Sequence, residues 1–340
     1  MAITVPSGSI RFNTDSSKLE IYNGEAWFEI NATSRELDTG GTSGVFGTGV
    51  SPGGNVMDYI NVSSTGNAID FGDFYDATYE TASASSRSRG VMLGGYDPSP
   101  STRVNTCAFI TISSTGNSSD FGDLTEPRGH SSGCSNQTRG LCAGGQTNPE
   151  GSTVSNVIDY ITIAQTGNAV NFGDLASATA FMGNGRNNVT RAVFIAGIAP
   201  SATNVMSYVT ISTLGDAADF GDSLEDDYGQ GSGNASNAVR SILAGANNTG
   251  GNPLNTISFL SVSTLGNAKD FGDLATVRRG TGAVASGTRA VFGGGRTPSD
   301  VNIIDYVEIA TTGNATDFGD LTNNRSFNNA GMSNGHGGLG

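Results

Sequence analysis

The sequence predicts an all-β fold of six four-stranded repeats, a six-bladed β-propeller. Three observations support this prediction. The tetrapeptide Asp-Phe-Gly-Asp, once Asn-Phe-Gly-Asp, recurs near residues 70, 120, 171, 219, 270 and 317. Successive Phe residues of this DFGD motif are 50, 51, 48, 51 and 47 residues apart. The residues between them form short apolar or alternating runs typical of strands, and they show no helical periodicity.

Each repeat contains four predicted strands in a constant order. An apolar run ending in glycine, such as VMLGGY at 91–96, suits a strand that is buried on both faces. An alternating segment such as DYINVS at 58–63 follows, and a tight TGN turn leads to the returning strand with the DFGD motif. A segment of small residues, such as GAVASGT at 282–288, completes the unit.

The two ends of the repeat region predict that the ring closes on itself. The first repeat begins at VFGTG, residues 45–49, and lacks a small-residue strand before it. The last repeat continues past its DFGD motif to residues 323–335. We therefore expect a C-terminal strand to pair with the first strand near 44–49, which would remove the open sheet edge. The predicted domains are an N-terminal module at 1–36 and the propeller at 37–340.

Composition and charge exclude several classes of partner. The net charge is −14 and no basic cluster occurs, whereas nucleic acids and anionic membranes are bound through Lys and Arg. No apolar run approaches the roughly 20 residues of a membrane span, and the N-terminus has no secretory signal. We therefore expect synthesis in a cytoplasm, without nucleic-acid or membrane partners.

The recurring residues are predicted to be structural, because a catalytic motif has no reason to occur six times. Each Phe should pack between neighbouring blades, each Gly should adopt positive φ or allow close backbone approach, and the second Asp should bond nearby backbone N–H groups. A ring of calcium sites is the alternative, but two carboxylates supply too few oxygens. An Arg before the apolar run in five repeats suggests a ring of Arg–Asp bridges. The residues are Phe71, Phe121, Phe172, Phe220, Phe271 and Phe318; Asp73, Asp123, Asp174, Asp222, Asp273 and Asp320; and Arg89, Arg139, Arg191, Arg240 and Arg289.

Departures from the repeat mark the candidate binding loops. Three acidic, tyrosine-bearing segments stand out, at 74–80, 96–100 and 224–230. Tyr with Asp suits sugar or protein binding, although solvated variable loops would look the same. The candidates are Tyr75, Asp76, Tyr79, Tyr96, Asp97, Asp226, Asp227 and Tyr228. His130 and His336 lack metal-ligand spacing, and no nucleophile, zinc or phosphate-loop motif occurs, so we expect no enzyme activity, metal or cofactor. The sequence leaves open a glycosidase site built from two paired carboxylates.

Residues 1–36 lie outside the repeats and predict three short strands, SIRFN, KLEIYN and AWFEI. Ile10, Phe12, Leu19, Ile21 and Trp27 offer an apolar face for anchoring. A sheet this small is only marginally stable on its own. We therefore expect it to pack on the propeller, oligomerise or dock on a partner.

Two resemblances extend this interpretation. The double-glycine run, the aromatic residue about a dozen positions later and the period of about 50 resemble kelch propellers, although the Trp usual in kelch blades is absent from the repeats. Gly8, Ser9, Ile10, Arg11, Phe12, Asn13, Asp15, Leu19, Glu20, Tyr22, Gly24 and Trp27 resemble an N-terminal module of bacteriophage tail-fibre and other virion proteins, and the STGNA-DFGD phrase resembles repeats of marine phages, including those of cyanobacteria.

These resemblances imply a non-enzymatic virion protein that is assembled in the bacterial host cytoplasm. It would be a tail fibre, an appendage or a capsid decoration, joined to other virion proteins through the N-terminal module and oligomeric through the symmetry of the virion. The propeller would be displayed to bind a host-surface glycan or protein. Two alternatives remain: a glycan-cleaving propeller enzyme of a phage appendage, and a bacterial kelch-type interaction scaffold.

Overall fold

The regular structure of this protein is almost entirely β-strand. The computed structural model describes residues 5–14, 18–29, 41–47, 49, 54–148, 153–195, 197–198, 201–224, 232–248, 250–326 and 330–339. Within these ranges the single exception is a turn of 3-10 helix, η2 (Gly337–Leu339), and no helix has the length and hydropathy of a membrane span. The predicted all-β class is confirmed. The chain divides into two compact units, Met1–Thr39 and Gly40–Gly340.

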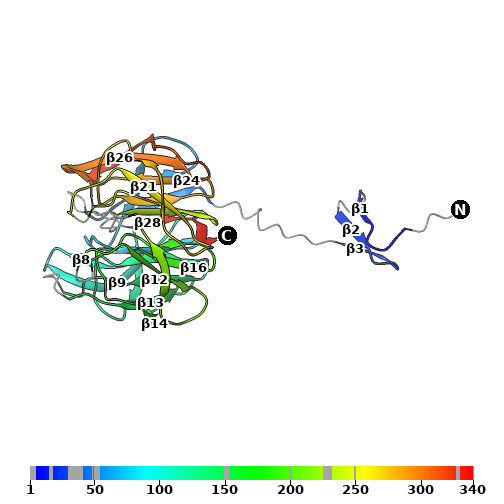
Figure 1. Cartoon of the computed structure of the whole chain (residues 1–340), viewed down its shortest axis with the longest axis horizontal. Helices are drawn as coiled ribbons and strands as arrows, with labels where there is room; N and C mark the ends of the chain where they lie inside the picture. The colour runs from blue at the N-terminus through cyan, green and yellow to red at the C-terminus, as the bar shows by residue number, and fades with distance from the viewer. Residues whose placement is uncertain are drawn as a thin grey trace. The chain divides into compact units, whose positions relative to one another are not determined.

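The first unit contains the predicted three-stranded antiparallel sheet. It runs in the order β1 (Ile10–Asn13), β2 (Lys18–Tyr22) and β3 (Trp27–Glu29) (Figure 1). We refer to it as the N-terminal sheet.

The second unit contains six antiparallel sheets, which we number from the N-terminal end of the unit. Sheet 1 consists of β28 (Gly331–Ser333), β4 (Ser43–Phe46), β5 (Val56–Asn61) and β6 (Ile69–Asp73); sheet 2 of β7 (Ala82–Ser85), β8 (Arg89–Asp97), β9 (Thr102–Thr111) and β10 (Ser119–Asp123); and sheet 3 of β11 (Ser132–Ser135), β12 (Arg139–Ala143), β13 (Val157–Thr162) and β14 (Val170–Asp174). Sheet 4 consists of β15 (Arg186–Asn187), β16 (Arg191–Phe194), β17 (Val205–Thr210) and β18 (Ala218–Asp222); sheet 5 of β19 (Gly233–Ser236), β20 (Arg240–Ala244), β21 (Thr256–Ser261) and β22 (Lys269–Asp273); and sheet 6 of β23 (Gly282–Ala285), β24 (Arg289–Gly293), β26 (Ser299–Glu308), β27 (Thr316–Arg325) and the short β25 (Arg296–Thr297). Four strands per repeat are thus confirmed, with β25 an addition in sheet 6.

The small-residue strand lies at one end of each sheet, and these six strands, β7, β11, β15, β19, β23 and β28, are the inner strands below. Their neighbours explain the small side chains. A Cβ added to Gly133 in β11 would lie 2.1 Å from the carbonyl oxygen of Ser83 in β7, and one added to Gly331 would lie 1.7 Å from that of Ala283. Backbones this close leave no room for larger residues.

The DFGD motif forms a β-bulge in all six sheets. Strand pairing shifts by one residue at the motif Phe, as between Met57↔Gly72 and Asp58↔Asp70 in sheet 1. The extra residue turns Phe toward the next sheet: Phe121 is 2 % exposed and packs with Ile161 and Ile163 of sheet 3. The predicted packing of Phe between sheets is confirmed.

The motif Gly serves both predicted purposes. Gly72 has φ +135°, and a Cβ there would lie 2.6 Å from the carbonyl group of Gly116, in the next hairpin turn. The second Asp differs from expectation. Its backbone N–H donates to a side chain in the hairpin of the next sheet, as Asp73 N–H does to Asn117 Oδ1 at 3.0 Å. The first Asp of sheet 1, Asp70, accepts the N–H of Gly72.

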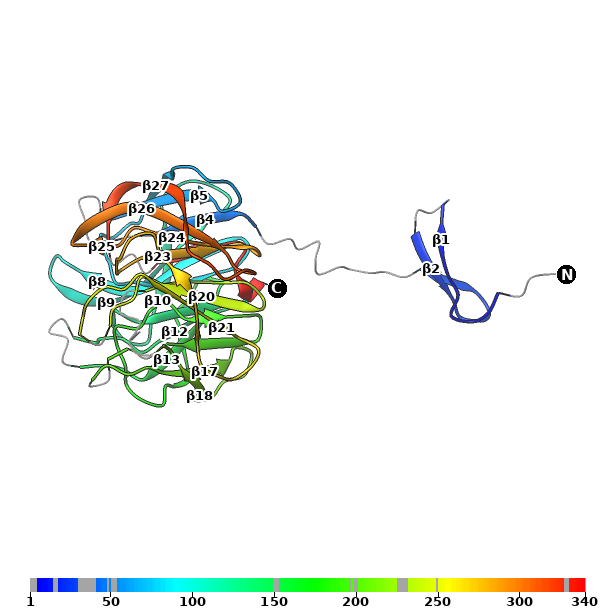
Figure 2. The same ribbon diagram turned by 45° about the horizontal axis from the view of Figure 1, so that its top comes forward.

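Backbone hydrogen bonds at this motif link every sheet to the next. The hairpin Gly of one sheet donates its N–H to the motif Phe carbonyl of the preceding sheet, at 2.7 to 3.0 Å. The pairs are Gly116–Phe71, Gly167–Phe121, Gly215–Phe172, Gly266–Phe220, Gly313–Phe271 and Gly66–Phe318. The last pair joins sheet 1 to sheet 6. Figure 2 accordingly shows β27 near β5, and Thr322 of β27 donates hydrogen bonds to the carboxylate of Asp58 in β5.

The C-terminal strand completes the first sheet, as predicted. β28 pairs antiparallel with β4, with Met332 opposite Val45, and so occupies the inner position of sheet 1. Ser43 N–H also donates to Asn334 Oδ1 at 2.9 Å. Because of this pairing, β4 has partners on both sides and presents no open edge.

The predicted Arg–Asp ring is wrong in its partners. The guanidinium of Arg89 lies over the Phe109 ring at 4.7 Å and donates to the carbonyl of Ile163 in sheet 3. Arg139, Arg191, Arg240 and Arg289 repeat this arrangement, so they do join neighbouring sheets, but through carbonyl oxygens. Arg89 pairs with Thr111 whereas Asp123 pairs with Thr106. Five residues of strand, roughly 17 Å, therefore separate the Arg from the motif Asp.

Buried Arg–Asp pairs exist elsewhere in the repeat. Arg128 bonds Asp159 at 2.6 Å, Arg278 bonds Asp305 at 2.8 Å, and Arg325 bonds Asp58. Each Arg comes seven residues after a motif Phe, and each Asp lies in the third strand of the following sheet. All six side chains are at most 5 % exposed. A buried charge needs such a partner, because desolvation of an unpaired ion is very unfavourable.

Candidate functional site

The predicted binding loops meet at one place in the described chain. Tyr79, before β7, and Tyr96, in β8, exchange backbone hydrogen bonds of 3.1 and 2.8 Å, and their ring centroids are 5.1 Å apart. Burial, reinforced by Glu80, raises the pKa of Tyr79. Asp97 accepts the N–H of Ser99, which shapes the turn after β8.

The other predicted loop residues are not brought into this pair. Tyr75 is exposed beside Phe74, with ring centroids 5.6 Å apart, and burial together with Asp76 raises its pKa. Asp226, Asp227 and Tyr228 lie outside the described residues.

A buried charged cluster supports the two tyrosines. Arg103 lies 4.8 Å over the Tyr96 ring and forms an ion pair with Glu80. His130 Nε2 lies 2.9 Å from the other Glu80 oxygen, and its ring stacks on Phe181 at 4.2 Å. Burial alone would raise the pKa of Glu80, but His130 and Arg103 together hold it below its usual value.

Three members of this cluster share an unusual backbone conformation. Glu80, His130 and Phe181 have φ of +60°, +53° and +58°. They occupy one position in three successive repeats, where another repeat has Gly280 with φ +72°. Side chains in this conformation cost about 1–3 kcal/mol each and concentrate at functional sites. The aligned repeats carried this signal, since Glu, His and Phe replace a glycine, but the sequence prediction missed it.

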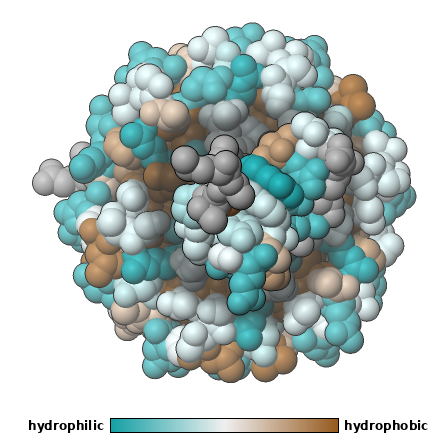
Figure 3. Space-filling view, turned by 90° about the vertical axis from the view of Figure 1, so that its right-hand side faces the viewer, coloured by the Kyte–Doolittle hydropathy of each residue, from teal (hydrophilic) through white to brown (hydrophobic). Residues whose placement is uncertain are grey.

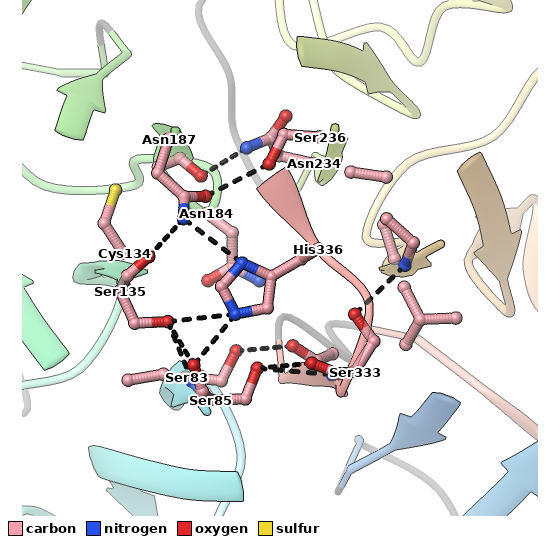
Figure 4. A pocket seen from close by; sticks show the side chains of 18 residues that line it. Ser83, Ser85, Cys134, Ser135, Asn184, Asn187, Asn234, Ser236, Ser333 and His336 are labelled. Carbon is pink, nitrogen blue, oxygen red and sulfur yellow. Dashed lines mark hydrogen bonds between the residues drawn. The ribbon is translucent and has the colours of Figure 1, made fainter. Parts of the chain in front are cut away.

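A second candidate is a pocket between the inner strands. All six inner strands line it, and its volume is about 40 Å³ (Figure 4). Hydrogen bonds join neighbouring inner strands around it: Ser135 Oγ to Ser85 O at 2.9 Å, Ser236 Oγ to Asn187 Oδ1 at 3.2 Å, and Ser85 Oγ to Ser333 O at 3.0 Å. The space suits a few water molecules and is too small for a sugar ring.

His336 fills the centre of this pocket (Figure 4). Its Nε2 donates to Ser85 O at 2.8 Å, while Nδ1 accepts the N–H of Gly338 at 3.1 Å. The imidazole is therefore neutral, because a proton on Nδ1 would oppose the Gly338 donor. Burial, with a smaller contribution from Arg87, lowers the pKa of His336 to about 4.

Acidification should destabilise the protein through His336. An unfolded His has a pKa near 6.5, whereas the folded value is about 4, so between these pH values only the unfolded chain binds the proton. The stability contributed by the neutral imidazole is complete above about pH 6.5 and is lost as pH falls through about 4. Urea midpoints measured across this window should fall less steeply in His336→Asn than in wild type; equal slopes would contradict the assignment.

The N-terminal sheet carries an exposed apolar face. Strand register puts Ile10 opposite Ile21 and Ile21 opposite Phe28, with Phe12 opposite Leu19, so these five side chains share one face. Ile10 and Phe12 are each 61 % exposed and Phe28 is 53 % exposed. Trp27, predicted to belong to this set, lies on the opposite face against Tyr22 and beneath Arg11, because it directly precedes Phe28 in the strand.

The surface hydrophobic groups, the cysteines and the possible metal ligands among the described residues do not form a further candidate site. In the space-filling view, hydrophobic residues form small groups separated by hydrophilic ones (Figure 3). Cys107, Cys134 and Cys142 are free and buried, and burial raises the pKa of each thiol. Among the residues that the structure describes, no group of three or more His, Cys, Asp or Glu side chains could hold a metal ion.

Comparison with models of known protein families and a search of curated proteins found no match.

Proposed function

We propose that the six sheets are the blades of a six-bladed, kelch-like β-propeller. The hydrogen bonds that run from each motif Phe to the next hairpin, and from sheet 6 back to sheet 1, support a closed ring. The pocket between all six inner strands supports the same arrangement, since inner strands surround the axis of a propeller.

We further propose that the protein is a non-enzymatic virion structural protein, either a tail fibre, an appendage or a capsid decoration. The exposed apolar face of the N-terminal sheet is the observation that carries this proposal. Five apolar side chains on so small a sheet favour burial against another protein, and the resemblance of this module to virion modules suggests a virion partner. The propeller would be displayed for binding to the host surface or to another virion protein.

The Tyr79–Tyr96 pair is the part of the propeller best suited to that binding. Two adjacent aromatic rings backed by a fixed cation and acid offer flat apolar area with polar edges. The strained backbone at Glu80, His130 and Phe181 supports a binding role at this place.

Replacing the apolar face tests the anchoring proposal. Particles assembled with wild-type protein or with a Phe12→Ser/Phe28→Ser variant would be purified and this chain quantified by mass spectrometry. Burial of each Phe is worth about 1.5–3 kcal/mol, so incorporation should fall more than about tenfold. Arg11→Gln, which alters the opposite face, is the matched control and should incorporate normally.

Two outcomes would count against this function. Wild-type incorporation of the double variant would show that the apolar face does not anchor the chain. Release of reducing ends from host polysaccharide by the purified protein would favour a glycan-cleaving enzyme instead.

A further inference from the structure

The place occupied by the buried Arg–Asp pair can be compared across all six sheets. In sheets 1, 3 and 6 a guanidinium fills it. Arg128 in sheet 3 donates to the carbonyls of Val157 and Cys142 at 2.7 and 3.3 Å as well as to Asp159. These three sheets therefore have a filled, polar interior at this point.

Two further sheets fill the same place by other means. In sheet 2 the Asp is replaced by Ala108, and Phe74, where most repeats have Leu, packs against Ala108 and Met92. In sheet 5 the Asp is replaced by Ser258, which accepts a bond of 3.1 Å from the fully buried Arg186 of β15. A large side chain thus compensates for the missing pair in both sheets.

Among the described residues, sheet 4 has neither the pair nor a side chain that takes its place. Thr179 and Ser207 stand where sheet 3 has Arg128 and Asp159, and Leu175 stands where sheet 2 has Phe74. The result is a hollow of about 140 Å³ between the β16–β17 strands and the loop before β15. Ser207 is partly exposed, whereas its five counterparts are buried, so the hollow opens to solvent.

The lining of this hollow defines what it can bind. Six of its ten lining residues are apolar: Leu175, Ala176, Met182, Phe194, Ile195 and Val205. The other four, Ser177, Thr179, Thr203 and Ser207, carry hydroxyl groups, and no charged side chain lines the hollow within the described ranges. An apolar cavity of about 150 Å³ accommodates one benzene molecule, so the volume corresponds to one small ring.

We propose that sheet 4 contains a binding site for a neutral, mainly apolar single-ring group with one hydrogen-bonding substituent. The ring would occupy the space that a guanidinium or a Phe side chain fills in other sheets. Its substituent would bond the hydroxyl groups of Thr179 or Ser207, or the local backbone carbonyls. The site rests on the comparison of repeats and is independent of the virion proposal.

Phenol is the probe, because it has one ring and one hydroxyl group. Phenol is expected to bind the full chain saturably, with a Kd of about 1 mM, as measured by ligand-observed NMR. Thr179→Arg/Ser207→Asp installs the pair of sheets 1, 3 and 6 and should weaken binding more than about tenfold. Leu175→Phe, which copies Phe74 of sheet 2, should do the same and provides a second test if the charged variant folds poorly.

Three results would overturn the proposal. One is the absence of saturable phenol binding to the wild-type chain. Another is unchanged phenol binding in a folded Leu175→Phe or Thr179→Arg/Ser207→Asp protein, with folding verified by circular dichroism. The third is binding of methyl glucoside but not phenol, which would assign the hollow to polar sugars rather than apolar rings.

Discussion

Arg278→Ala is expected to lower the free energy of unfolding by about 3–5 kcal/mol, because it leaves Asp305 as an uncompensated buried charge. Asp305 is 1 % exposed, and the Arg278 guanidinium also donates to the Phe292 carbonyl at 3.2 Å. Removing one partner therefore costs both the ion pair and a backbone contact. Chemical denaturation monitored by far-UV circular dichroism would measure the decrease in the free energy of unfolding.

The Arg296–Asp300 pair provides the matched control for this variant. Its atoms are 3.9 Å apart and Arg296 is 44 % exposed, so Arg296→Ala should cost no more than about 1 kcal/mol. Arg278→Met/Asp305→Leu removes both charges and should be far less damaging than the single change. Equal effects of Arg278→Ala and Arg296→Ala would refute the energetic role of the buried pair.

Gly122→Ala should destabilise the protein by about 1–3 kcal/mol more than Gly116→Ala, since overpacking adds to backbone strain. Both glycines have positive φ, +137° and +153°. A Cβ at Gly122 would lie 2.6 Å from the Gly167 carbonyl group, whereas a Cβ at Gly116 meets nothing within 4 Å. The difference between the two variants isolates the cost of separating sheet 2 from sheet 3.

The measurement is again the denaturation midpoint, with the slope of the transition as a check on cooperativity. Similar losses in the two variants would mean that φ strain alone requires the motif glycine. In that case the close approach between sheets would contribute little to its recurrence.

The features that repeat six times were the ones that sequence could predict. Strand order, the packing of the motif Phe and the need for the motif Gly follow from comparing equivalent segments, because a requirement shared by every sheet leaves a visible pattern. The β28–β4 pairing follows from the strand that the first repeat lacks, whereas the bulge at the Phe was not predicted. The partner of Arg89 and its equivalents was predicted wrongly. Spacing along the chain does not show which end of a sheet a side chain occupies, and Arg and motif Asp lie at opposite ends.

The functional features lie where repeats differ, and there single-sequence reasoning is weaker. The Tyr79–Tyr96 contact was not foreseeable, since it joins the segment before β7 to the end of β8, beyond a shift in strand register between Leu93 and Gly95. The Arg–Asp pairs were detectable in principle. In three repeats an Asp directly precedes the Tyr of the third strand, at Asp58, Asp159 and Asp305. These are also the three repeats that are preceded by an Arg seven residues after a motif Phe. The same comparison shows that sheet 4 lacks the pair, but only the structure shows that a hollow is left among the described residues.

Pairing of the last strand with the first has a consequence for the order of folding. Ser43 and Asn334 are hydrogen-bonded across 291 residues of chain. Closing a loop of that length costs about 3 kcal/mol more entropy than closing a ten-residue hairpin, so sheets 2 to 5 should form before sheet 1 is complete. During synthesis β4 keeps an unpaired edge until β28 has left the ribosome. A chain that ends early would keep that edge and be prone to pair with another copy.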